Sequence, residues 1–152
     1  MALPNIFAED VTTEICNRIE KLTPETQALW GKMNVAQMLA HCSVTYEYIF
    51  TDKYPKPKGF KKFILKLLVK GIVVNEKAYK KANPTAPDFI IVGERIFEDE
   101  KTRLIDYIKR TQALGENHFE GKESHSFGVL KKQEWNNMFY KHLNHHLSQF
   151  GV

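Results

Sequence analysis

The stretch MFYKHLNHHLSQFGV, residues 138–152, decides the fold, because it combines helical periodicity with three closely spaced histidines. At about 100° per residue, its apolar and aromatic side chains fall on one face of a helix. His142 and His146 lie near the middle of that face, whereas His145 lies to one side. The pattern predicts a C-terminal helix over residues 131–149 that buries two of its three histidines.

Two imidazoles at positions i and i+4 can reach the same metal ion, because these side chains are neighbours on a helix. Burying two imidazoles requires either hydrogen-bond partners or a metal. The pair is therefore either two metal ligands or two hydrogen-bonded core histidines. A metal would need a third ligand. His41, on another helix, is a better candidate than the loop histidines His118 and His125, because metal sites in helical bundles use side chains of facing helices. The alternative for His41 is an ordinary hydrogen-bonded histidine.

The remaining periodicity predicts an almost entirely helical chain forming one domain, residues 1–152. Asn34, with Gln37 three residues later, has the spacing of a capping box at the start of a helix. Four long helices and one helix in a crossover connection predict an all-α fold, a four-helix bundle with at least one long connection. The expected helices are 7–21, 34–49, 60–81, 94–114 and 131–149; the expected loops are 52–59, 83–88 and 116–129, and 89–92 is expected to be extended.

The composition is that of an ordinary globular protein, with 43% hydrophobic and 26% charged residues. The formal net charge of +4 is too small to argue for nucleic-acid binding. Two cysteines imply no disulfide framework and suit a reducing compartment. The N-terminal MALPNIFAED lacks the pattern of a signal peptide, and the most apolar window, 63–74, is too short and too charged to span a membrane. We therefore expect a cytoplasmic protein without a membrane span.

A lysine stands at every fourth position from Lys58 to Lys70, beside an apolar stripe through Phe63, Leu67 and Leu68. One interpretation is a basic amphipathic helix that lies on an anionic membrane or partner. The other is a helix that packs its apolar stripe on the core and leaves its lysines in solvent. The second is favoured, because amphipathic helices of folded domains usually face the core.

Cys42 stands next to His41, which raises the hypothesis of a Cys–His nucleophile. Adjacent helical residues point about 100° apart and do not face each other. Because Cys42 lies within the apolar stripe of its helix, a buried and inert thiol is the favoured interpretation.

Two segments, LTPETQALWGKMNVAQMLAHC (22–42) and MFYKHLNHHLSQFGV (138–152), together resemble the DinB-like superfamily, and more narrowly a branch of small uncharacterised bacterial proteins in it. The resemblance lies in Trp30 ahead of a capped helix, His41 about two turns into that helix, and H-x-x-x-H-x-x-Q near the end. It implies a DinB-like four-helix bundle and a divalent metal held by His41, His142 and His146. Three neutral protein ligands leave coordination positions of the metal open for water or substrate, as in catalytic rather than structural sites.

The function that this resemblance implies is a metal-dependent enzyme that activates a thiol or water, such as a thiol-dependent S-transferase or a hydrolase. Its partners would be a low-molecular-weight thiol and a small electrophilic substrate, and its metal zinc, nickel, copper or iron. The alternative is a non-catalytic metal-binding or stress-associated bundle. A homodimer fits a small bundle with apolar loop segments such as residues 89–92.

Four further residues are candidates for the surroundings of the site. Gln149 has the spacing to orient an imidazole, or it is simply a polar residue of the last helical turn. Trp30 and Asn34 are candidates to line a pocket, and their ordinary roles would be a packing anchor and a helix cap. His145 is the candidate for the border of the site, and for it the interpretation as a solvated residue stays open.

Overall fold

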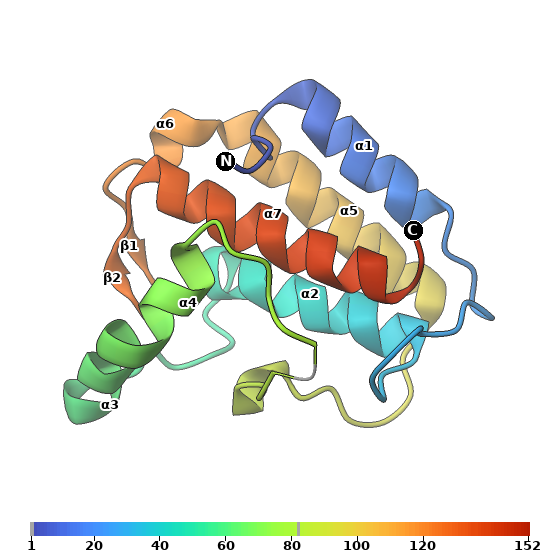
Figure 1. Ribbon diagram of the computed structural model, residues 1–152, viewed down its shortest axis with the longest axis horizontal. Helices are drawn as coiled ribbons and strands as arrows, with labels where there is room; N and C mark the ends of the chain where they lie inside the picture. Colours follow the sequence, from blue (N-terminus) through green and yellow to red (C-terminus); the bar gives the residue numbers. More distant parts are fainter. Residues whose placement is uncertain (1, 82) are drawn as a thin grey trace.

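The computed structural model describes residues 2–81 and 83–152 and is mostly helical, so the predicted all-α class is confirmed. The helices α5 and α7 each contact both α1 and α2, so that the four surround a common interior (Figure 1). Among the described residues, no helix has the length and hydropathy needed to cross a bilayer. The four long helices are α1 (Glu9–Glu20), α2 (Val35–Phe50), α5 (Phe97–Leu114) and α7 (Lys132–Gln149).

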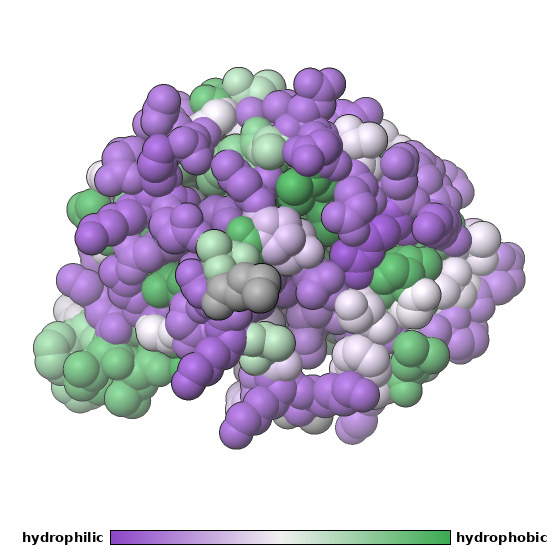
Figure 2. All heavy atoms as spheres, turned by 45° about the horizontal axis from the view of Figure 1, so that its top comes forward, coloured by the Kyte–Doolittle hydropathy of each residue, from purple (hydrophilic) through white to green (hydrophobic). Residues whose placement is uncertain are grey.

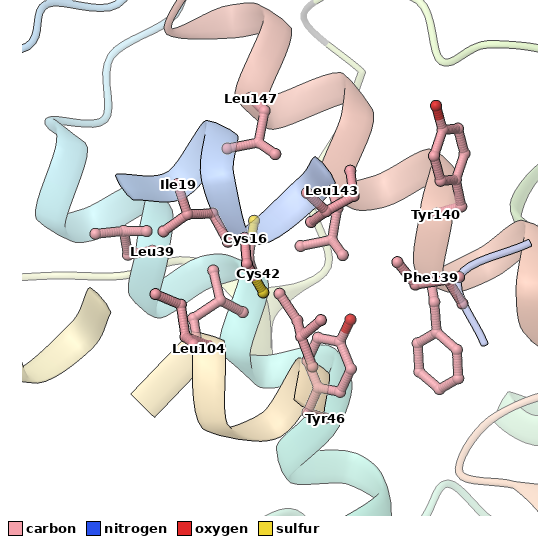
Figure 3. Close-up of a cluster of buried hydrophobic side chains, with 14 of the residues drawn as sticks. Cys16, Ile19, Leu39, Cys42, Tyr46, Leu104, Phe139, Tyr140, Leu143 and Leu147 are labelled. Atoms are coloured by element: carbon pink, nitrogen blue, oxygen red, sulfur yellow. The ribbon is translucent and has the colours of Figure 1, made fainter. Parts of the chain in front are cut away.

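The core lies between these four helices, and each of them contributes fully buried aliphatic side chains to it. Cys42 of α2 is only 1% exposed, and burial raises the pKa of its thiol far above the ordinary value. The prediction that Cys42 is buried is therefore confirmed, and a raised pKa disfavours the reactive thiolate. Figure 3 shows one side chain from each helix pointing into this interior: Ile19, Leu39, Leu104 and Leu147.

The start of α2 follows the predicted capping box. The Asn34 side chain accepts a hydrogen bond from the Gln37 backbone N–H at 2.8 Å, and the Gln37 side chain accepts one from the Asn34 N–H at 3.1 Å. This reciprocal cap satisfies two donors that a helix start would otherwise leave unpaired. It fixes where α2 begins, and hence where His41 lies along it.

Two segments that were expected to lie outside helices differ from the sequence-based prediction. The expected loop over 116–129 contains a short helix, α6 (Glu116–Phe119), and an antiparallel pair of strands, β1 (Glu123–Ser124) and β2 (Gly128–Val129). The Phe119 ring is fully buried in the core, which anchors this segment. The segment 89–92 was expected to be extended, but its first residue, Phe89, is the last residue of a single 3₁₀ turn, η2 (Pro87–Phe89).

The helix predicted over 60–81 ends earlier and is not packed as expected. It consists of α3 (Gly59–Ile64), the π-helical turn η1 (Leu65–Val69) and α4 (Lys70–Val74), which we call the arm. Its α4 end rests on α7, and α3 projects away from the other helices (Figure 1). Because none of its residues is buried, the prediction that its apolar stripe faces the core is wrong.

Candidate metal centre

Three histidines predicted as ligands meet between two facing helices. His41 comes from α2, and His142 and His146 come from adjacent turns of α7. One ring nitrogen of each lies within 4.8 Å of those of the other two, and the Nε2 atoms of His41 and His142 are 3.0 Å apart. His41 and His146 are buried, whereas His142 is partly exposed. The structure therefore brings together, in a largely buried place, three side chains that could hold one metal ion.

Hydrogen bonds on the outer side of the site determine which nitrogen points inward. His41 Nδ1 lies 2.9 Å from the backbone carbonyl of Phe89, and His146 Nδ1 lies 2.8 Å from Oε1 of Gln149. A carbonyl oxygen only accepts, so both Nδ1 atoms carry the proton. The Nε2 atom of each ring is then an unprotonated lone pair. Metal-binding histidines show the same arrangement, with the outer N–H on an oxygen acceptor.

His142 can exist in either tautomer, because its outer partner is a hydroxyl. Its Nδ1 lies 3.1 Å from Thr45 Oγ1, which can donate or accept. With the proton on Nε2, His142 donates to His41 Nε2 and Thr45 donates to Nδ1. With the proton on Nδ1, the lone pairs of His142 and His41 face each other, an arrangement that a cation stabilises. The two tautomers suit the metal-free and the metal-bound states.

The electrostatics of the site keep the three histidines neutral. Burial lowers the pKa of His41 and, together with the neighbouring imidazoles, holds the pKa of His142 well below its ordinary value of 6.5. Burial, with a smaller contribution from His41, lowers the pKa of His146 to about 3. All three rings are therefore neutral at pH 7, which is the form that binds metal ions.

Gln149 is itself held in place by the loop that precedes α2. Its side-chain amide donates to the backbone carbonyl of Trp30 at 2.6 Å, which leaves Oε1 to accept from His146. Gly31 makes this approach possible, since a Cβ at this position would lie 2.4 Å from the Gln149 amide nitrogen. The backbone at Gly31 also has φ +88°, a conformation that favours glycine.

A family model described as "Protein of unknown function (DUF1569)" matches residues 8–151. The chain belongs to the DUF1569 family. The matched range includes the three histidines and all four long helices. Neither the curated proteins nor the solved structures contain a match to the chain.

The other residues predicted near the site of this DUF1569 protein lie at its border or outside it. The three-histidine group includes neither His145 nor Asn34, and Asn34 serves as the cap of α2. The His145 ring lies edge-on to the rings of Trp30 and Tyr79, with centroids 6.1 and 5.7 Å away. The Lys81 ammonium lies over the face of the Trp30 ring, with its Nζ 4.3 Å from the ring centroid.

The loop histidines lie in different surroundings. His125 stacks on Tyr48 with ring centroids 3.7 Å apart, and His118 Nε2 lies 2.8 Å from the Lys122 ammonium. Neither belongs to the three-histidine group. The sequence-based preference for His41 as the third member therefore agrees with the geometry.

Three partners of the site were missed by the sequence-based prediction. The Phe89 carbonyl is a backbone group, and no side-chain pattern marks it. Gly31 precedes a helix cap, and its need for a positive φ has no sequence signal beyond the residue type. Thr45 could have been found, because it follows His41 by four positions and so lies on the same side of α2.

Proposed function

We propose that the protein is a metal-dependent enzyme of the DinB-like superfamily that holds one divalent ion through His41, His142 and His146. One observation carries the proposal: the three rings converge from two helices, each with its outer nitrogen bonded to an oxygen. Such outer contacts orient imidazoles for metal binding and raise their basicity. An ordinary group of core histidines would not need three neutral rings turned toward one point.

The proposal extends to the arrangement of the helices. The ring of α1, α5, α2 and α7 fits a four-helix bundle in which the segment between α2 and α5 is a long crossover. The arm is the additional helix in that connection. In this arrangement the site lies between the second and last bundle helices, as the resemblance to the DinB-like superfamily implies.

The donor set fits a divalent transition metal, because neutral imidazole suits zinc, nickel and iron. When bound, such an ion supplies Lewis-acid activation of a thiol or a water molecule. The protein's own residues orient the site: the Phe89 carbonyl and Gln149 fix the rings of His41 and His146. His142 is the most exposed of the three, so a small thiol and its electrophilic partner would approach on its side.

A second function, metal binding without turnover, is favoured by the position of Phe89. The Phe89 ring lies edge-on against both His41 and His142, with centroids 5.3 and 5.8 Å away. It therefore covers part of the site with an apolar group. A protein that stores or senses a metal benefits from such a cover, whereas an enzyme must admit its substrate beside it.

Elemental analysis of the protein purified without a histidine tag tests the metal site. We expect about one divalent ion per chain, lost in His142→Ala and in His146→Ala. His145→Ala is the matched control, because it removes a neighbouring imidazole outside the three-histidine group. Circular dichroism of each variant reports whether the helices are retained. A native protein that takes up no metal from zinc, nickel or iron salts would exclude both functions.

Turnover distinguishes the two functions once metal has been found. The metal-loaded protein is mixed with a panel of low-molecular-weight thiols and a chromogenic electrophile. Product formation that requires both the metal and His142 supports the enzyme. A stoichiometric metal without turnover, including in a Phe89→Ala variant that uncovers the rings, supports metal binding alone.

A further inference from the structure

The arm, residues 59–74, carries an apolar face that is exposed in the described chain. Five large side chains on it are each between 55% and 78% exposed, whereas single exposed hydrophobic residues are the ordinary case. Figure 2 shows a continuous hydrophobic area at the lower left, where α3 lies in Figure 1. A contiguous patch of this kind marks an interaction site. Its members are Phe60, Phe63, Leu67, Leu68 and Ile72.

The opposite side of the arm explains why this face points outward. Lys62 forms an ion pair with Glu123 at 2.7 Å, and Lys70 forms one with Glu134 of α7 at 3.0 Å. Lys66 lies between them in sequence, and the end of its side chain lies beside Gly128 of β2. Lysines four residues apart share one side of a helix, so the basic side is attached to the body of the protein. The apolar side is thereby held toward solvent.

The charge of the arm defines the kind of partner that fits it. The arm holds four lysines, at positions 61, 62, 66 and 70, and no acidic residue, and Lys58 directly precedes it. Lys58 and Lys61 are exposed, and within residues 2–81 and 83–152 neither has an ion-pair partner. The occupant must therefore be apolar in one part and negatively charged in another.

We propose that the arm docks on an anionic membrane surface. Interfacial helices place Phe and Leu side chains at the boundary between headgroups and acyl chains, with lysines among the headgroups. The exposed face from Phe60 to Ile72 would enter this boundary, and Lys58 and Lys61 would lie beside anionic headgroups. The inference rests on the arm alone and is independent of the proposed function of the histidines.

Two other occupants fit the arm less well. A second copy of the chain would bring two lysine-rich segments together, and like charges would oppose the contact. A nucleic acid would satisfy the lysines but would leave the apolar side chains in water. A lipid surface satisfies both halves of the arm, because it offers an apolar layer beside negatively charged headgroups.

Co-sedimentation with lipid vesicles tests the proposal on the full-length protein. Vesicles of phosphatidylcholine are compared with vesicles that also contain phosphatidylserine, at low and at high salt. We expect binding only with phosphatidylserine, weakened by salt. Lys58→Gln combined with Lys61→Gln should lower the partition coefficient about thirty-fold, since each lysine near an anionic surface contributes a factor of about five.

The apolar half is tested by Phe60→Ser, Phe63→Ser and Leu67→Ser in one chain, which should abolish sedimentation. These side chains are exposed, so circular dichroism should show unchanged helix content. The matched control is Leu29→Ser with Val92→Ser, two equally exposed apolar residues outside the arm, and it should bind like the native protein. Binding that survives the triple substitution, or no binding to phosphatidylserine vesicles, overturns the proposal. So does a native dimer that the triple substitution converts to monomer, because a second copy would then be the occupant.

Discussion

Acidification of the metal-free protein should reveal the cost of burying His146. The folded-state pKa is lowered to about 3 from 6.5. Below pH 6.5 the unfolded chain therefore binds a proton that the folded chain does not, and unfolding becomes easier as the pH falls. The loss continues until the pH approaches the folded-state value. From pH 7 to pH 5, this single side chain should lower the free energy of unfolding by about 2 kcal/mol.

Urea denaturation followed by circular dichroism measures this loss, with a chelator present throughout. The comparison is between the native protein and His146→Gln, whose amide does not titrate and can still bond to Gln149. The other buried histidines titrate in both proteins, so the difference between the two pH dependences isolates His146. The free energy of unfolding of the variant should fall by about 2 kcal/mol less between pH 7 and pH 5. Equal losses in the two proteins would refute the conclusion that His146 is buried in its neutral form.

Three further predictions follow from the same contacts. Gly31→Ala should displace the Gln149 amide and lower metal affinity by about ten- to a hundred-fold in competition with a chromophoric chelator; an equal effect in a Gln149→Ala background would show that the substitution acts elsewhere. Thr45→Val should also weaken metal binding about ten-fold or more, because it removes the acceptor of His142 Nδ1, whereas Thr45→Ser should restore it; identical affinities for the two variants would contradict this role. Phe119→Ala should lower the free energy of unfolding by about 3–5 kcal/mol, since the ring is fully buried beside Phe139 and Trp135; a loss below about 1 kcal/mol would mean that α6 is not anchored by this ring.

The helices that carry the candidate ligands could be predicted because their apolar residues recur at helical spacing. That spacing placed His142 and His146 on the inner face of α7, and the capping box at Asn34 set the start of α2. The place of His41 on a helix favoured it over the loop histidines, and the family resemblance supported it as the third member. The hydrogen-bond partner that orients His41 could not be predicted, because the Phe89 carbonyl belongs to a distant turn and leaves no pattern in the side chains.

For the arm, the helical pattern could be predicted from the sequence, but the side that packs on the rest of the protein could not. Its periodicity correctly indicates an amphipathic helix, but periodicity does not say which face is covered. The answer depends on Glu123 and Glu134, two acidic residues far along the chain that pair with its lysines. The hairpin near Glu123 was missed for a related reason: each strand has only two residues, too few to show alternation.

The three candidate ligands lie far apart along the chain, and this separation determines how a bound metal ion would affect resistance to proteolysis. His41 and His142 are 101 residues apart, so an ion held by both would close a loop of that length. Disulfides supply such crosslinks in other proteins. A crosslink that closes a longer loop removes more conformational entropy from the unfolded chain. Both cysteines of this chain are free and buried, so the ion would be its one long-range crosslink among the described residues. Resistance to proteolysis would then follow the supply of metal.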